Sequence, residues 1–155
     1  MKVAIRVDGS WDIGSGHLVR CATLAKGLRE HGAEIIFLCR KLDSRSCEFL
    51  ESKGLSVAYL DIRAGATTLR RHDDIPDVEW DGSIQQGDCL ASSHILSRQG
   101  SVDWLVIDHY GIDIRWESRM RDFASHIMVI DDLANRKHDC DVLLNQNVCS
   151  QNENR

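Results

Sequence analysis

The fold is decided by the stretch KVAIRVDGSWDIGSGHLVRCATLAKGL, residues 2–28. Residues 2–7 form a short β-branched run that is typical of a strand, and the turn-rich segment after it predicts a loop. From His17 onward the apolar residues fall on one helical face, and Gly32 marks the expected end of that helix. The stretch therefore predicts a strand, a glycine-rich loop and a helix in succession.

The rest of the chain repeats this alternation. We expect further strands at 34–40, 55–60, 102–111, 126–134 and 139–147, and further helices at 44–54, in the second half of 81–100 and at 113–124. Ser44 is the expected N-cap of the second helix. Ile114, Met120 and Phe123 are expected on the inner face of the last one. Residues 61–80 lack a clear period and are predicted to form a long loop. The alternation predicts an α/β fold, a Rossmann-like parallel sheet with helices on both faces.

The composition is that of an ordinary globular domain. With 155 residues the chain fits one domain, and its net charge of −5 offers no basic field for nucleic acid or an anionic membrane. We find no signal peptide and no apolar window long enough to span a membrane. The six cysteines are irregularly spaced without a C-x-x-C pair, which favours reduced thiols in a cytoplasmic protein.

The glycine-rich loop departs from the two common phosphate-binding motifs. The dinucleotide fingerprint G-x-G-x-x-G begins with Gly14 and Gly16, but Val19 stands where the third glycine belongs. The second strand ends at Arg40 instead of the acid that would bind an NAD ribose. A P-loop needs a lysine where Ser15 stands. We therefore expect neither NAD binding nor P-loop chemistry, and we predict no cofactor.

The same loop is nevertheless suited to a phosphate. Gly14, Ser15 and Gly16 can present backbone N–H groups beside the positive end of the following helix, with no bulky side chain to block a diphosphate. His17 then lies within reach of whatever the phosphate carries. An imidazole has an ordinary pKa of about 6.5, so its neutral form is available as a base at physiological pH. The alternative is that His17 only caps the helix or packs against it.

Acidic residues follow four of the predicted strands: Asp8, Asp61, Asp108 and Asp131. Ligands of doubly wound folds collect at the carboxyl ends of the strands, so these residues indicate polar chemistry at that edge, although each could equally cap a helix. A metal site in the HDCD segment at 138–141 is not favoured, because adjacent strand residues point in divergent directions. One at Asp131 and Asp132 is not favoured either, because that stretch lacks phosphate-loop chemistry. We predict no metal.

In three motifs, taken in order and spacing, the chain resembles a known family: RVDGSWDIGSGHLVRC (6–21), VIDHYGID (106–113) and VIDDLANRKHDCDVLLNQN (129–147). The family is that of the UDP-2,4-diacetamido-2,4,6-trideoxy-β-L-altropyranose hydrolases of pseudaminic acid biosynthesis, the PseG family. The resemblance runs along essentially the whole chain. It implies the N-terminal half of a glycosyltransferase-B-type fold, with a UDP-sugar bound in the cleft between two lobes.

The resemblance also implies a reaction and a set of site residues. The reaction is hydrolysis of the bond between sugar C1 and the UDP oxygen, with inversion at C1, and His17 maps onto the general base that activates water. UDP is a good leaving group, so one base and a phosphate cradle can suffice. The expected substrate-binding residues are Asp8, Gly14, Ser15, Gly16, Arg20 and Tyr110.

For three of these residues the sequence leaves more than one role open, as follows. Asp8 orients His17, binds a sugar amide or hydroxyl, or caps its turn. Arg20 reaches a phosphate or pairs with an acid. Tyr110 offers the sugar both an apolar face and a hydroxyl.

The expected organisation is one lobe at 1–147 and a polar tail at 148–155, which looks cut before a second, nucleotide-binding lobe. That lobe would be supplied in cis or by another chain. Two other functions remain open: a glycosyltransferase lobe with a hydroxyl acceptor, and an inactive or partner-binding fragment.

Overall fold

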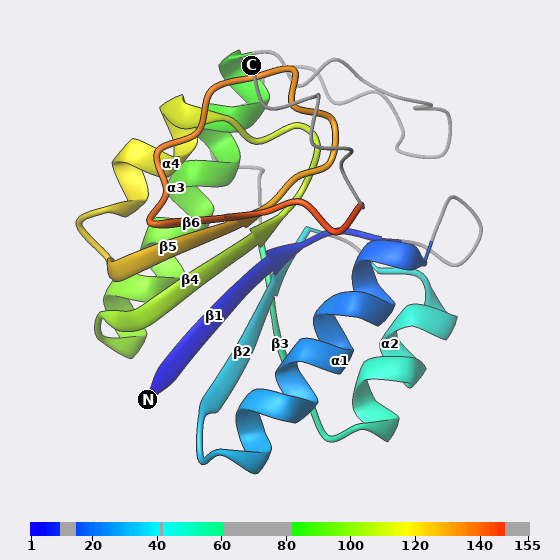
Figure 1. Ribbon diagram of the computed structural model, residues 1–155. Coiled ribbons are helices and arrows are strands. Elements are labelled where there is room, and N and C mark those ends of the chain that lie inside the picture. The colour runs from blue at the N-terminus through cyan, green and yellow to red at the C-terminus, as the bar shows by residue number, and fades with distance from the viewer. Residues whose placement is uncertain (10–14, 41, 61–81, 148–155) are drawn as a thin grey trace.

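The computed structural model in Figure 1 has one central sheet between two layers of helices, and it describes residues 1–9, 15–40, 42–60 and 82–147. The strands are β1 (Lys2–Val7), β2 (Glu34–Cys39), β3 (Ser56–Tyr59), β4 (Val102–Asp108), β5 (Ala124–Ile130) and β6 (Val142–Leu144). The helices are α1 (Gly16–Glu30), α2 (Ser44–Ser52), α3 (Gly82–Gln99) and α4 (Ile114–Met120). The predicted loop at 61–80 and the tail at 148–155 lie outside the described residues.

The sheet has six strands in the order β3-β2-β1-β4-β5-β6, and every pairing is parallel. The chain starts in the middle of the sheet, builds outward through β2 and β3, and then returns to add β4 on the other side of β1. This is the Rossmann strand order, whose direction reverses between β1 and β4. The predicted fold class, a Rossmann-like parallel sheet, is confirmed.

The helices of the first half cover one face of the sheet. Leu18 of α1 and Leu50 of α2 are fully buried in one apolar cluster with Ile5 of β1 and Phe37 of β2. Figure 1 shows these two helices side by side on that face. Burial of each such side chain contributes about 1.5–3 kcal/mol, so this packing holds the start of α1 firmly against β1.

The helices of the second half cover the opposite face. Leu96 of α3 and Trp116 of α4 pack in a second cluster with Leu105 and Ile107 of β4. Since successive strand residues point to opposite faces, β4 contributes Val106 to the first cluster. The prediction of helices on both faces is thus also confirmed.

Two helix ends follow the expected glycine pattern. Gly32 after α1 and Gly54 after α2 have φ angles of 81° and 62°, a left-handed conformation that glycine adopts without steric cost. The expected N-cap Ser44 is wrong: Asp43 caps α2, and its side chain accepts a hydrogen bond from the N–H of Ser46 at 2.7 Å. A carboxylate one residue earlier reaches that N–H, and Ser44 becomes the first helical residue.

The second half of the chain differs from the expected pattern in three places. Helix α3 (Gly82–Gln99) begins near the start of the 81–100 segment, which was predicted to be helical only in its second half. Ile114 is 38% exposed, because Trp116 and Met120 form the inner face of α4. Strand β6 keeps only Val142–Leu144 of the predicted stretch.

Candidate functional site

The candidate site lies at the carboxyl edge of the sheet, where β1 and β4 run side by side. Val7 pairs with Asp108, so the residues that follow β1 and those that end β4 meet at this edge. Helix α1 begins at Gly16, just after the loop that leaves β1. This edge is the switch point of the fold, the place where doubly wound proteins bind ligands.

The central contact of the site joins His17 and Asp108. Nδ1 of His17 lies 2.5 Å from a carboxylate oxygen of Asp108, whose side chain is fully buried, while the His17 side chain is 23% exposed. The same Nδ1 also lies 2.8 Å from Nη2 of Arg20. When Nδ1 carries the proton and donates it to the Asp108 carboxylate, Nε2 is the basic nitrogen of the ring. Within the described ranges, no residue hydrogen bonds to Nε2 of His17.

Arg20 lies one helical turn after His17 and binds the same carboxylate. Its Nε donates to Asp108 at 2.5 Å and its Nη2 donates to the other oxygen. Burial alone would raise the pKa of Asp108, but the hydrogen bonds from Arg20 and His17 outweigh burial and lower it. Of the two alternatives for Arg20, the structure shows pairing with an acid, whereas a contact with phosphate stays a prediction.

Asp8 belongs to a different set of contacts. One oxygen accepts a hydrogen bond from Arg6 at 2.7 Å and lies 3.2 Å from Nε2 of His109, and the other accepts from the N–H of Arg40 at 2.9 Å. Burial opposes ionisation here, but the charge of Arg6 and the hydrogen bond from His109 hold the pKa of Asp8 well below its usual range. It is Asp108, and not Asp8, that contacts His17.

His109 is held in one tautomer by its two neighbours. Its Nδ1 accepts from the N–H of Gly111 at 2.9 Å, so the proton is on Nε2, which faces Asp8. Burial lowers the pKa of His109, which keeps the ring neutral. His109 therefore stabilises the end of β4 through its contacts with Gly111 and Asp8.

Tyr110 connects His17 to a further carboxylate. Its ring meets the His17 ring edge to face, with centroids 4.6 Å apart and planes at 84°. Its hydroxyl donates to Asp132 at 2.8 Å, and the side chain is 42% exposed. Burial and this hydrogen bond raise the pKa of Tyr110, so the hydroxyl stays protonated.

The loop residues before α1 are described in part. Gly14 lies outside the described residues. Ser15 precedes the helix and its side chain makes no capping hydrogen bond in the described part of the chain. Gly16 is exposed, and a Cβ placed there would meet no described atom within 4 Å. Neither its φ angle nor its packing requires glycine, which agrees with an open approach for a ligand.

Sequence reasoning missed the buried ion pair beneath the site. Arg6 of β1 is fully buried and donates to both oxygens of Asp88 on α3, at 3.1 and 2.6 Å. Trp116 donates its indole N–H to the same carboxylate at 3.0 Å. A charged residue inside an apolar strand pattern was the available signal, because a buried guanidinium requires a carboxylate partner.

The other acidic residues weighed in the sequence have protein partners. Asp131 lies 2.8 Å from Nη2 of Arg136, and His138 lies 2.7 Å from the buried Glu117. Among the described residues no group of three or more His, Cys, Asp or Glu side chains could hold a metal ion. No helix in the part of the chain that the structure describes is long and apolar enough to cross a membrane.

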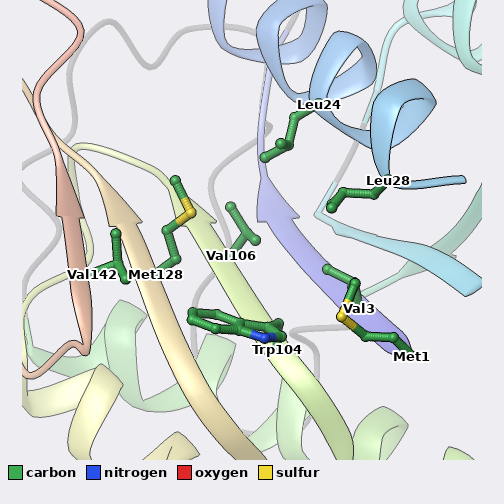
Figure 2. A pocket seen from close by; sticks show the side chains of 8 residues that line it. All are labelled: Met1, Val3, Leu24, Leu28, Trp104, Val106, Met128 and Val142. Atoms are coloured by element: carbon green, nitrogen blue, oxygen red, sulfur yellow. The ribbon is translucent and has the colours of Figure 1, made fainter. Parts of the chain in front are cut away.

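A hollow of about 180 Å³ lies away from this site, on the face of the sheet that carries α1. Figure 2 shows its apolar lining, which includes Leu24 and Leu28 of α1 and Trp104 and Met128 of the sheet. Met1 and other residues at the start of the strands line it, so it lies toward the end of the sheet opposite Asp108. Such a lining is unsuited to a diphosphate.

Comparisons with known proteins give a likeness of fold. No protein-family model matches the chain, and no curated protein matches it. Among solved structures, apo UGT2 of Phytolacca americana is similar, with 19% identity and a TM-score of 0.48 over 84% of this chain and 29% of that chain. BdcA in complex with NADPH is similar with 14% identity and a TM-score of 0.44, over 85% of this chain and 52% of that chain. The chain thus spans about a third of the first protein and half of the second, and at these identities the likeness concerns the fold alone.

Proposed function

We propose that this chain is the catalytic-base lobe of a nucleotide-sugar hydrolase, with His17 as the general base. The observation that carries the proposal is the contact of His17 Nδ1 with the buried Asp108 at 2.5 Å, at the switch point of a Rossmann-like sheet. A base oriented by a buried carboxylate, beside a glycine loop at a helix N-terminus, supplies both groups needed to cleave a sugar from a diphosphate.

The proposed step begins with a water molecule at Nε2 of His17. Nε2 removes one proton, the water oxygen forms a bond to sugar C1, and the bond from C1 to the phosphate oxygen breaks with its electron pair on UDP. Attack from the face opposite UDP inverts C1. Asp108 stabilises the imidazolium formed in this step, as a carboxylate does in hydrolytic triads. UDP leaves as an anion, so the step needs no acid from the protein.

The finer assignment rests on sequence motifs. The resemblance of 6–21, 106–113 and 129–147 to the pseudaminic acid pathway hydrolases supports a UDP-linked 2,4-diacetamido-2,4,6-trideoxy sugar as the substrate. It also supports a second lobe that binds most of the UDP, joined in cis or supplied by another chain. Residues 1–147 would form the lobe described above. We place the reaction in the cytoplasm, with which the free thiols of the described cysteines are compatible.

The experiment that tests this proposal is product analysis. The chain is incubated with the UDP-linked diacetamido sugar, UDP is followed by phosphorus NMR, and the anomer of the released sugar is followed by proton NMR. Hydrolysis predicts free sugar with inverted C1. A glycoside formed only when a hydroxyl acceptor is added would instead identify a glycosyltransferase lobe. Failure to form either product when the second lobe is also supplied would contradict the proposal.

A further inference from the structure

Three aspartates at the carboxyl edge of the sheet are each paired with an arginine. Asp8 pairs with Arg6 at 2.7 Å, and Asp131 pairs with Arg136 at 2.8 Å. Asp108 is bound in the same way by Arg20. An aspartate whose oxygens are neutralised by a guanidinium has little remaining attraction for a ligand's hydrogen-bond donor. These three carboxylates are therefore occupied by the protein itself.

Asp132 is the exception at this edge. In the described ranges no cationic side chain forms an ion pair with it, and its hydrogen-bond partner is the neutral hydroxyl of Tyr110 at 2.8 Å. Its neighbour Asp131 is buried, with its second oxygen accepting from the N–H of Ala134, whereas Asp132 is half-buried and accessible. A carboxylate accepts several hydrogen bonds, and a single phenol leaves most of that capacity unused.

The position of this carboxylate relates it to the candidate base. The Tyr110 ring meets the His17 ring edge to face, and the hydroxyl of the same tyrosine donates to Asp132. Tyr110 thus links His17 to Asp132 through two direct contacts. A glycosyl group bound near His17 would therefore lie beside Tyr110, the residue that binds the Asp132 carboxylate.

We propose that Asp132 is a specificity-determining residue that accepts a hydrogen bond from a donor on the bound glycosyl group, and that Tyr110 positions it. The donor is an N–H or O–H group, because an ionised carboxylate is only an acceptor. The inference rests on the proposed function for the presence of a sugar near His17. It adds the group that distinguishes one sugar from another.

The test measures binding, so that it does not depend on hydrolysis. Chemical-shift titrations of the labelled chain use UDP-N-acetylglucosamine, UDP-glucose and UDP as probes. The variants are Asp132→Asn, Tyr110→Phe and the double variant, with Asp122→Asn as the matched control. Asp122 is an exposed carboxylate between α4 and β5, near the opposite edge of the sheet. Thermal unfolding of each variant establishes that it is folded.

We expect Asp132→Asn to weaken binding of at least one UDP-sugar about tenfold while the affinity for UDP stays unchanged, as the loss of a charge-assisted hydrogen bond requires. Tyr110→Phe should weaken it less and should add nothing in the Asp132→Asn background. The UDP-sugar whose affinity falls most identifies the donor as an amide or a hydroxyl. Unchanged sugar affinity in Asp132→Asn, or no shift at residues 110 and 132 with any UDP-sugar, would overturn the proposal. A large Asp132 effect without hydrolysis would contradict only the proposed function.

Discussion

Asp108 binds His17 across 91 residues of sequence, and this contact joins the end of β4 to the start of α1. The carboxylate also receives two hydrogen bonds from Arg20, so its orientation is fixed from two directions. His17 is consequently held with Nδ1 toward Asp108. The proposed chemistry depends on this orientation.

Replacing Asp108 by Asn should slow hydrolysis about a hundredfold, because the amide can no longer stabilise the imidazolium or fix the ring tautomer. The measurement is kcat from UDP release. Asp103→Asn is the control, since Asp103 lies near the start of β4 and accepts a hydrogen bond from the N–H of Lys2. Equal kcat for Asp108→Asn and the wild type would remove Asp108 from the mechanism.

Replacing Gly16 by Val should weaken binding of the nucleotide sugar at least about tenfold, because a branched side chain would block the approach of the diphosphate. The fold should survive, since a Cβ at this position meets no described atom within 4 Å. Gly27→Val tests the same substitution near the other end of α1, where a Cβ also meets no described atom. Equal losses of affinity in the two variants would mean that the effect comes from the helix and not from the ligand.

Replacing Arg6 by Met should destabilise the protein by about 3–5 kcal/mol, because it leaves the buried Asp88 carboxylate without its cation. The free energy of unfolding in urea measures this loss. Arg115→Gln removes an exposed ion pair with Asp113 and should leave stability unchanged. If the two variants are equally stable, the buried ion pair of Arg6 and Asp88 does not stabilise the fold beneath the site.

The free energy of unfolding should fall as the pH decreases from about 5 to about 3. Asp8 and Asp108 have pKa values lowered from the ordinary 3.8 in the folded protein, so they stabilise the fold fully only above that value. As the pH decreases, the unfolded chain binds protons first and this stabilisation is lost. Urea unfolding over this range measures the loss, which should be smaller in Asp108→Asn. A flat profile would show that neither carboxyl is stabilised by folding.

The sequence predicted the fold from local patterns. The β-branched run at 2–7, the helical period after His17 and the glycines at 32 and 54 all lie where the structure has the corresponding elements. Local patterns were less accurate at element ends. Asp43 and Ser44 are both good caps, and a hydrogen bond to Ser46 decides between them. The burial of Trp116 in place of Ile114 depends on packing that a single helix does not determine.

The site was predictable only in part, because its partners depend on the order of the strands. His17 and Tyr110 were singled out by their loops, and the structure brings their rings together. The sequence did not identify the partner of His17, because Asp8 and Asp108 both follow predicted strands. Only the pairing of β1 with β4 shows which of the two carboxylates lies under α1. Asp132 could not be separated from Asp131 without the direction in which each side chain points.

The most direct test of the central claim is a single-turnover measurement of UDP release by phosphorus NMR. The protein is in molar excess over the UDP-linked diacetamido sugar, so that weak binding does not hide the chemical step. Wild type is compared with His17→Gln and with His94→Gln, which alters an exposed histidine on α3. We expect wild type and His94→Gln to release UDP at the same rate and His17→Gln to be slower by about a hundredfold or more. Equal rates for wild type and His17→Gln would contradict the central claim.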